Sequence, residues 1–445
     1  MLLDDVGFGA SSAFGGPINM PTAQRLADGG LRYNRFHTTA LCSPTRAALL
    51  AGRNHHSVGM GGITEIATSA PGYNSLRPNT MAPLAEILRL NGYSTSQFGK
   101  CHEVPVWETS PMGPFDHWPS PGNGMEHFYG FIGGETNQYY PALYDGTQPV
   151  EPWGTPEQGY HFMDDMTDKA IGWMHAQKSL MPDEPFFMYF APGATHAPHH
   201  VPKEWADKYK GKFDQGWDRV REETLARQKQ TGSVPADTRL TEWDERIPAW
   251  DATDERIRPF LAREMEVYAG FLEYADHHVG VLIDAMAELG ELDNTLIYYL
   301  IGDNGASAEG TMQGTLNESF TLNHATALET PDYLMQHIDD LGTPVAYNHY
   351  AIGWAHAMCT PFQWPSTSPP SIRPSWPSCS GCSSSRRPNT TYCRWTTVPP
   401  SASTRGWPVD RNSLPATYRR STRAWCACPK TRSSVSRTAR TRSRL

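Results

Sequence analysis

The stretch YSTSQFGKCH, residues 93–102, decides the fold class, because a β-type run ends here in a glycine and polar side chains. We predict a strand over Tyr93–Phe98 and a loop that begins at Gly99. Two further apolar runs, Phe186–Ala191 and Thr295–Ile301, are predicted strands that also lead into polar loops with Gly or Pro. Longer amphipathic stretches separate them. This alternation indicates an α/β fold with a mostly parallel central sheet flanked by helices.

Apolar residues recur at three- and four-residue spacing between these runs, which is typical of amphipathic helices. We predict helices over Met81–Asn91, Met163–Gln177 and Ala262–Leu289. Residues 203–258 are rich in charged residues and Trp and show little apolar periodicity, so we predict an insertion at the rim of the sheet. Because ligands bind beyond the carboxyl ends of the strands in such folds, we expect the polar loops to line one crevice.

Composition divides the 445 residues into two parts. Hydrophobic residues make up 39% of the chain, which is typical of a globular protein, and no apolar run reaches the roughly 20 residues that a membrane helix needs. Residues 365–445 instead consist largely of Ser, Arg, Pro and Thr, with fifteen Lys and Arg residues against one acid, Asp410. We hypothesise a frameshift near Trp364, with a genuine basic disordered tail as the alternative.

The formal net charge of −9 includes this basic tail, so residues 1–364 are strongly acidic, which disfavours nucleic acid as a partner. Three of the eight cysteines, Cys42, Cys101 and Cys359, precede the tail. Three scattered cysteines make no disulfide framework, and the chain starts without a basic and apolar signal segment. We therefore expect a reducing, cytoplasmic location.

The segment CSPTR, which opens at Cys42, predicts a helix start. Ser43 can cap a helix, Pro44 suits the first helical position, and Gly52 suits the end. Unpaired N–H groups at a helix N-terminus favour an anion such as sulfate or phosphate. Arg46, four residues on, lies on the same helix face and can reach back to residue 42. By spacing alone, a buried structural thiol before an ordinary helix remains an equal alternative.

Two apolar runs each end in a pair of oxygen ligands with a glycine nearby. Asp4 and Asp5 follow the first run, and Asp303 and Asn304 follow the second. Hard cations such as Ca²⁺ or Mg²⁺ take carboxylate and amide oxygens, and a converging set of these four residues suits them. Taken singly, each pair is more often a turn or a helix cap.

The motif C-x-P-x-R, here Cys42 to Arg46 and shortly after a D-D-x-G element, resembles the signature of type I sulfatases. These belong to the alkaline phosphatase-like superfamily, and the resemblance is strongest to bacterial arylsulfatases. It implies that a dedicated modifying enzyme oxidises Cys42 to formylglycine (3-oxoalanine). It also implies a Ca²⁺ site, with Mg²⁺ as the alternative, whose ligands are Asp4, Asp5, Asp303, Asn304 and the modified Cys42.

The sequence G-K-x-H around Lys100 also resembles the family pattern. The resemblance implies that Lys100 holds the sulfate and that His102 contacts the formylglycine. His196 looks like the second histidine of the family, which binds the sulfate and can protonate the leaving oxygen. Arg46 is expected among the catalytic residues. One hydroxyl of the formylglycine hydrate would attack sulfur, and the other would then expel sulfate.

The resemblance implies hydrolysis of small-molecule sulfate esters, with aryl sulfates as the expected substrates. Hydrolysis of phosphonates or phosphodiesters, and an impaired remnant that only binds anions, are the alternatives. Two features depart from the family pattern: only Met1–Leu3 precede the acid pair, and no lysine follows Trp364 until Lys430. We therefore expect a catalytic domain over residues 1–364 with a truncated first strand, and a smaller C-terminal domain that is missing or garbled.

Overall fold

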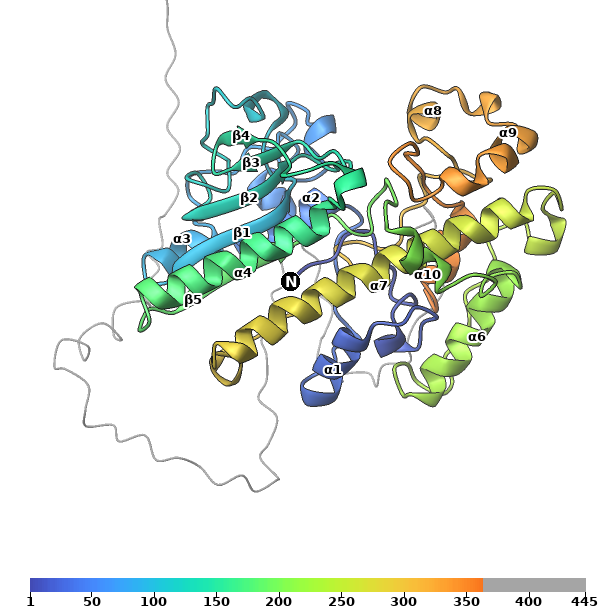
Figure 1. The fold of residues 1–445 in the computed structure, drawn as a ribbon, viewed down its shortest axis with the longest axis horizontal. Helices are drawn as coiled ribbons and strands as arrows, with labels where there is room; N and C mark the ends of the chain where they lie inside the picture. The colour runs from blue at the N-terminus through green and yellow to red at the C-terminus, as the bar shows by residue number, and fades with distance from the viewer. Residues whose placement is uncertain (363–445) are drawn as a thin grey trace, which may run out of the picture. The chain divides into compact units, whose positions relative to one another are not determined.

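The computed structural model describes residues 1–362. Trp364, with its hypothesised frameshift, and the predicted tail over residues 365–445 lie outside the described residues. Within the described chain a five-stranded sheet runs in the order β4-β3-β2-β1-β5 (Figure 1). The strands are β1 (Ser94–Cys101), β2 (His127–Ile132), β3 (Leu143–Asp145), β4 (Gln148–Val150) and β5 (Phe186–Ala191).

The predicted α/β class is confirmed, and the sheet is mixed. Strand β1 pairs in parallel with β2 on one side and β5 on the other. Strands β3 and β4 extend the sheet in antiparallel pairs beyond β2. The turn between β3 and β4 includes Gly146, whose φ is 61°, and so short a connection can only join antiparallel strands.

The predicted strands differ in how well they match the structure. Strand β5 has the predicted bounds, and β1 continues to Cys101, so Lys100 lies in the strand instead of a following loop. The predicted strand over Thr295–Ile301 is wrong, because this run makes only an isolated bridge between Leu2 and Leu300. In this bridge the N–H of Leu300 donates to the Met1 carbonyl and the N–H of Leu3 donates to the Leu300 carbonyl, and the backbone then turns at Asp5, whose φ is 53°.

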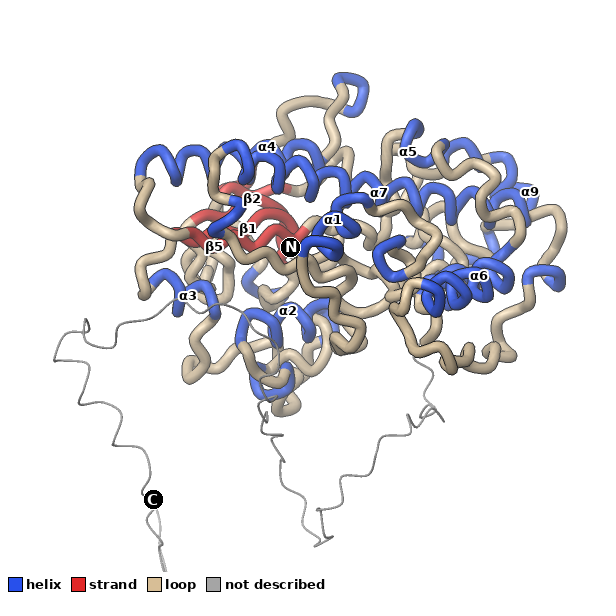
Figure 2. The backbone as a smooth tube through the Cα atoms, turned by 90° about the horizontal axis from the view of Figure 1, so that it is seen from below, coloured by secondary structure: helices blue, strands red, loops and turns tan. Residues whose placement is uncertain are grey.

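Two layers of helices cover the sheet (Figure 2). Helix α4 packs on β1 and β2 from one side and also contacts α7, whereas α3 packs on β1 from the opposite side together with α2. None of the helices within residues 1–362 is long and apolar enough to cross a membrane. The helix bounds are α1 (Pro21–Gly29), α2 (Cys42–Ala51), α3 (Leu84–Arg89), α4 (Phe162–Leu180), α5 (Lys203–Asp207), α6 (Gly216–Gln230), α7 (Arg258–Glu288), α8 (Ser319–Leu322), α9 (Pro331–Gln336) and α10 (Ile352–Met358).

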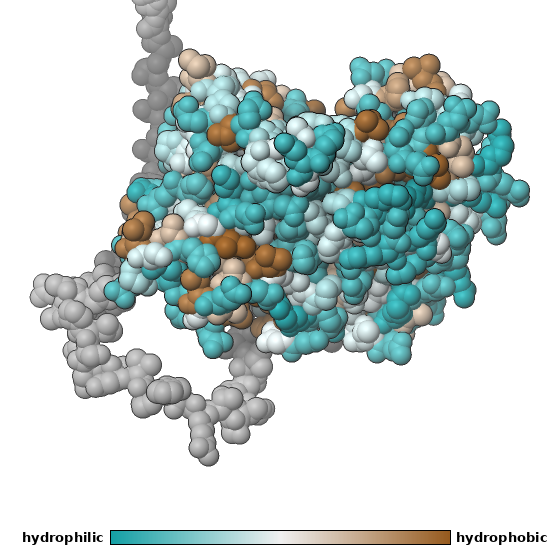
Figure 3. Space-filling view, viewed as in Figure 1, coloured by the Kyte–Doolittle hydropathy of each residue, from teal (hydrophilic) through white to brown (hydrophobic). Residues whose placement is uncertain are grey.

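The three periodic stretches do form helices, as predicted. Helix α3 is shorter than Met81–Asn91 because Pro83, with extended backbone (φ −63°, ψ 151°), occupies its N-cap. Helix α7 is buried on most of its circumference, and α1, α4 and α5 pack around it. The main hydrophobic core therefore lies along α7, while the face seen in Figure 3 is mostly hydrophilic with small apolar patches.

The predicted rim insertion over residues 203–258 contains α5 and α6. Helix α5 packs on α7, and α6 packs on α10. The ring of Trp217 in α6 makes T-shaped, edge-to-face contacts with the rings of Trp250 and Trp354, at centroid distances of 4.8 and 5.5 Å. This region therefore packs on the core through large aromatic side chains. Their spacing in the sequence is irregular, so they produce no apolar period.

Candidate active site

Helix α2 presents Cys42 as its first residue. Leu41, with an extended backbone (φ −140°, ψ 152°), is the N-cap, and the Thr45 N–H donates to its carbonyl, 3.3 Å away. The predicted cap at Ser43 is therefore wrong, and Pro44 occupies the third helical position, since the helix begins earlier than expected. The predicted end is confirmed, because Gly52 caps α2 in the left-handed conformation (φ 61°).

The thiol of Cys42 is buried, with Sγ 3.0 Å from Nδ1 of His102. Burial raises the pKa of Cys42 to about 12; nearby Asp carboxylates add to the rise and Lys100 opposes it. The thiol is therefore neutral near pH 7. A thiolate is the reactive form of cysteine, so this environment does not suit a cysteine nucleophile.

Three buried carboxylates lie beside Cys42. One oxygen each of Asp4, Asp5 and Asp303 lies within 4.8 Å of the others. The Asn304 amide donates to Oδ1 of Asp5 at 2.6 Å, and the backbone N–H of Asp5 donates to Oδ1 of Asp303 at 3.3 Å. The structure thus brings together all four oxygen-bearing residues that the sequence predicts as metal ligands, from segments almost 300 residues apart.

This cluster fits a divalent cation. Oδ1 of Asp4 and Oδ1 of Asn304 are buried acceptors without a hydrogen-bond partner. Burial, with Asp4 as the next cause, raises the pKa of Asp303, and burial also raises that of Asp5. A hard cation would bind these oxygens and relieve the repulsion between the carboxylates.

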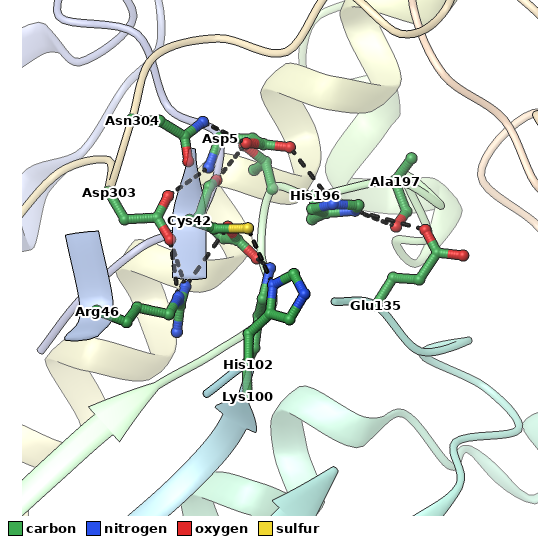
Figure 4. Close-up of polar contacts among 12 residues, drawn as sticks. Asp5, Cys42, Arg46, Lys100, His102, Glu135, His196, Ala197, Asp303 and Asn304 are labelled. Atoms are coloured by element: carbon green, nitrogen blue, oxygen red, sulfur yellow. Dashed lines mark hydrogen bonds and ion pairs between the residues drawn. The ribbon is translucent and has the colours of Figure 1, made fainter. Parts of the chain in front are cut away.

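Two buried cations pair with the same acids (Figure 4). Arg46 donates through Nε and lies through Nη2 against Oδ2 of Asp303, both at 2.8 Å, and its Nη2 is 3.4 Å from Oδ1 of Asp4. Its guanidinium therefore contacts these carboxylates, whereas the sequence places it toward residue 42. Nζ of Lys100 lies 2.5 Å from Oδ2 of Asp4. Burial opposes the charged form of Lys100, but Asp4, Cys42 and Asp303 together outweigh it and raise the lysine pKa.

Two histidines complete the site, and their pKa values are shifted in opposite directions. Burial lowers the pKa of His102 to about 4, Glu65 opposes this, and Lys100 adds to it. Burial and Lys100 also disfavour charge on His196, but neighbouring carboxylates, Asp5 foremost, outweigh them and raise its pKa to about 9. Nε2 of His196 lies 3.8 Å from Oδ2 of Asp5. His102 is thus neutral and His196 protonated near pH 7.

Two acids at this site carry no motif and are missed by sequence reasoning. Glu65, in the 3₁₀ turn Thr64–Ile66, contacts Nε2 of His102. Glu135 lies 3.7 Å from Nδ1 of His196 (Figure 4). Only the folded chain brings these glutamates to the histidines, and no local spacing marks them. Cys101, between Lys100 and His102, donates its thiol to Glu103 at 3.2 Å.

Comparisons with known proteins identify the family. The family model described as Sulfatase matches residues 1–344. An uncharacterized sulfatase of Schizosaccharomyces pombe is 30% identical over 382 residues, which is 81% of this chain and 65% of that protein. The arylsulfatase of Klebsiella aerogenes is 28% identical over 378 residues, which is 81% of this chain and 75% of that protein.

Among solved structures, the sulfatase-class protein yidJ of Bacteroides fragilis matches with a TM-score of 0.49 and 17% identity, over 71% of this chain and 64% of that one. The chain spans 65% of the length of the fission yeast relative. The family model covers most of the described residues, and both acid pairs lie within the matched range. The chain belongs to the sulfatase family.

Proposed function

We propose that this chain hydrolyses sulfate esters, with aryl sulfates as the substrate class, through a formylglycine made from Cys42. One observation carries the proposal: residue 42 lies between His102 and a buried cluster of three acids and two cations. A nucleophile at this position would face the charges needed to hold a sulfuryl group. The neutral state of the Cys42 thiol supports the proposed conversion to formylglycine, because an unmodified Cys42 would be a poor nucleophile.

The charged side chains of the site have two proposed roles: some bind the sulfuryl group or the cation, and Arg46 holds the carboxylates in position. When present, a hydrated formylglycine supplies a hydroxyl nucleophile at residue 42, and a divalent cation held by the four oxygen-bearing residues supplies positive charge. Lys100 would bind the sulfuryl oxygens, where fixed charge stabilises the transition state, and its burial and raised pKa support this role. Arg46 balances Asp303 and Asp4 and so holds the carboxylates in position.

The histidines move protons in opposite directions. His102 presents Nδ1 to residue 42, where a neutral ring can accept a proton from the nucleophile. His196 donates Nδ1–H to the Ala197 carbonyl at 2.8 Å, which leaves Nε2 directed toward the acid cluster. As a protonated ring, His196 can donate to the departing phenol oxygen.

Two further parts of the proposal concern the whole protein. We propose residues 1–364 as the catalytic domain, which the matched region 1–344 supports. We also propose a reducing, cytoplasmic location. The cysteines of the described chain, Cys42, Cys101 and Cys359, are all free and buried, which agrees with it.

The test is expression with a formylglycine-generating enzyme, followed by turnover of a chromogenic aryl sulfate. The Cys42 peptide should be lighter than its unmodified form and should react with hydrazide reagents, and Cys42→Ala should abolish both signals and the turnover. Active protein that retains an unmodified thiol would refute the mechanism.

The same charges could bind a phosphoryl group, so hydrolysis of phosphonates or phosphodiesters is the second candidate. Rates on aryl sulfate, phosphate diester and phosphonate esters with one leaving group separate the two. A preparation that is folded and modified, yet turns over none of them, would support the anion-binding remnant.

A further inference from the structure

Glu65 holds a position that the proposed mechanism does not use. Both of its carboxylate oxygens lie against Nε2 of His102, at 2.8 and 3.1 Å. The other ring nitrogen, Nδ1, lies 3.0 Å from Sγ of Cys42. The imidazole of His102 therefore bridges a carboxylate and the position of the proposed nucleophile.

This bridge selects one tautomer of the ring. An ionised carboxylate can only accept hydrogen bonds, so Nε2 of His102 must carry the proton that faces Glu65. A neutral ring has one N–H, which leaves Nδ1 as the lone pair directed at residue 42. Burial disfavours the ionised form of Glu65, but the hydrogen bond and charge interaction with His102, together with hydrogen bonds from Thr64 and the Glu65 backbone, outweigh it and lower the pKa of Glu65 to about 2.

Packing holds the ring in this orientation. His102 has only 3% of its side chain exposed, whereas Glu65 has 43% exposed. A Cβ on Gly134 would lie 3.0 Å from Cε1 of His102, so Gly134 gives the ring room to lie where it does. The ring is thus enclosed, and Glu65 is the partner of Nε2 that reaches it from the solvent side.

We propose that Glu65 is a positioning residue that fixes His102 in the Nε2–H tautomer and so keeps Nδ1 an acceptor toward residue 42. The effect on turnover rests on the proposed function, whereas the tautomer does not. Carboxylate partners commonly orient histidines in this way.

The tautomer is read directly by nitrogen NMR on metal-free, histidine-labelled protein of the full chain. The His102 signals are those lost in His102→Gln. We expect a protonated Nε2 and an unprotonated Nδ1 in the wild type, and an averaged or reversed pattern in Glu65→Ala. A wild-type ring protonated at Nδ1, or a pattern unchanged in Glu65→Ala, would overturn the inference.

A second Glu–His pair in the chain provides the matched control. His117 Nδ1 lies 2.8 Å from Oε1 of the buried Glu108, outside the site. Glu108→Gln should cost stability yet leave the His102 signals and kcat unchanged. If it changed them as much as Glu65→Ala does, the effect of Glu65 would be a general consequence of losing a carboxylate, and the proposal would fail.

Kinetics give the functional readout. With equal formylglycine content verified by mass, Glu65→Ala should lower kcat about tenfold or more and change KM by less than about twofold. Because Glu65 is partly exposed, added acetate should restore part of kcat in Glu65→Ala but not in His102→Gln. If the wild type is active and Glu65→Ala has the same kcat, the inference is overturned. An inactive wild type would count against the proposed function, and the NMR result would still decide the tautomer.

Discussion

Arg46→Met removes the guanidinium at the centre of the acid cluster, and its effect follows from the geometry. Nε and Nη2 of Arg46 both lie 2.8 Å from Oδ2 of Asp303, and neither side chain is exposed. Breaking a buried ion pair from one side costs about 3–5 kcal/mol, because the remaining charge stays buried without a partner. Methionine keeps much of the apolar volume, so packing adds little. In chelator, the free energy of unfolding should therefore fall by about 3–5 kcal/mol.

Calcium should reduce this loss. A divalent cation supplies part of the charge that Arg46 provided, and it no longer competes with the guanidinium for Asp303 and Asp4. The variant should therefore bind Ca²⁺ more tightly than the wild type does. The gain in stability, RT ln(1 + [Ca²⁺]/Kd), would then be larger in the variant at the same concentration of calcium.

The assay is urea unfolding followed by tryptophan fluorescence, in chelator and across a calcium series. The control is Arg89→Met, which removes an exposed arginine that pairs with Glu86 at 2.8 Å. Exposed pairs contribute less than about 1 kcal/mol, so this variant should unfold nearly as the wild type does. A loss below about 1 kcal/mol for Arg46→Met in chelator, or equal calcium increments in variant and wild type, would refute the reasoning.

Three other variants test single contacts. His196 has its pKa raised from 6.5 to about 9, so its stabilising contribution in metal-free protein is complete below pH 6.5 and is lost as pH rises through 9. The unfolding free energy of the wild type should fall across this window by about 3 kcal/mol more than that of His196→Gln, and parallel curves would contradict the charge assignment. Gly302→Ala requires a φ of 94° and a Cβ 2.0 Å from the Val6 carbonyl oxygen. It should lower stability by about 1–3 kcal/mol and weaken calcium binding in titration, and normal values for both would show that the loop adapts. Lys100→Met should lower kcat on aryl sulfate about a hundredfold, or ~3 kcal/mol, and a kcat within a few-fold of wild type would remove Lys100 from the sulfate site.

The sequence predicts those parts of the fold whose signal is local. The bounds of β5 are correct because an apolar run lies between two prolines, and α4 and α7 follow from their long apolar period. Strand β2 is not predicted, since Gly130 interrupts it. In the structure Gly130 pairs with Gly99, and a Cβ at 130 would lie 2.0 Å from the Gly99 carbonyl oxygen. The glycine that weakens the local signal is the residue that lets the two strands approach.

The sequence likewise predicts only part of the candidate site. Motifs predict which residues take part, but not how they pair. The helix period places Arg46 toward residue 42, whereas its partner in the fold is Asp303, 257 positions away along the chain. Glu65 contacts His102 across 37 positions and belongs to no motif. Contacts of this kind depend on tertiary packing, which no local pattern records.

The acid cluster and the sheet depend on the same backbone register. The N–H of Asp4 donates to the Ala194 carbonyl at 2.8 Å, and the N–H of Thr195 donates back to the Asp4 carbonyl at 2.6 Å. On the other side, the N–H of Leu3 donates to the Leu300 carbonyl at 3.0 Å, three residues before Asp303. Asp5 has a positive φ of 53°, so the backbone turns here and the consecutive carboxylates of Asp4 and Asp5 both join the cluster. A slip of one residue in either pairing would shift both carboxylates relative to Asp303. The short pairing at the start of the chain, too brief to count as a strand, is therefore what aligns the two acid pairs.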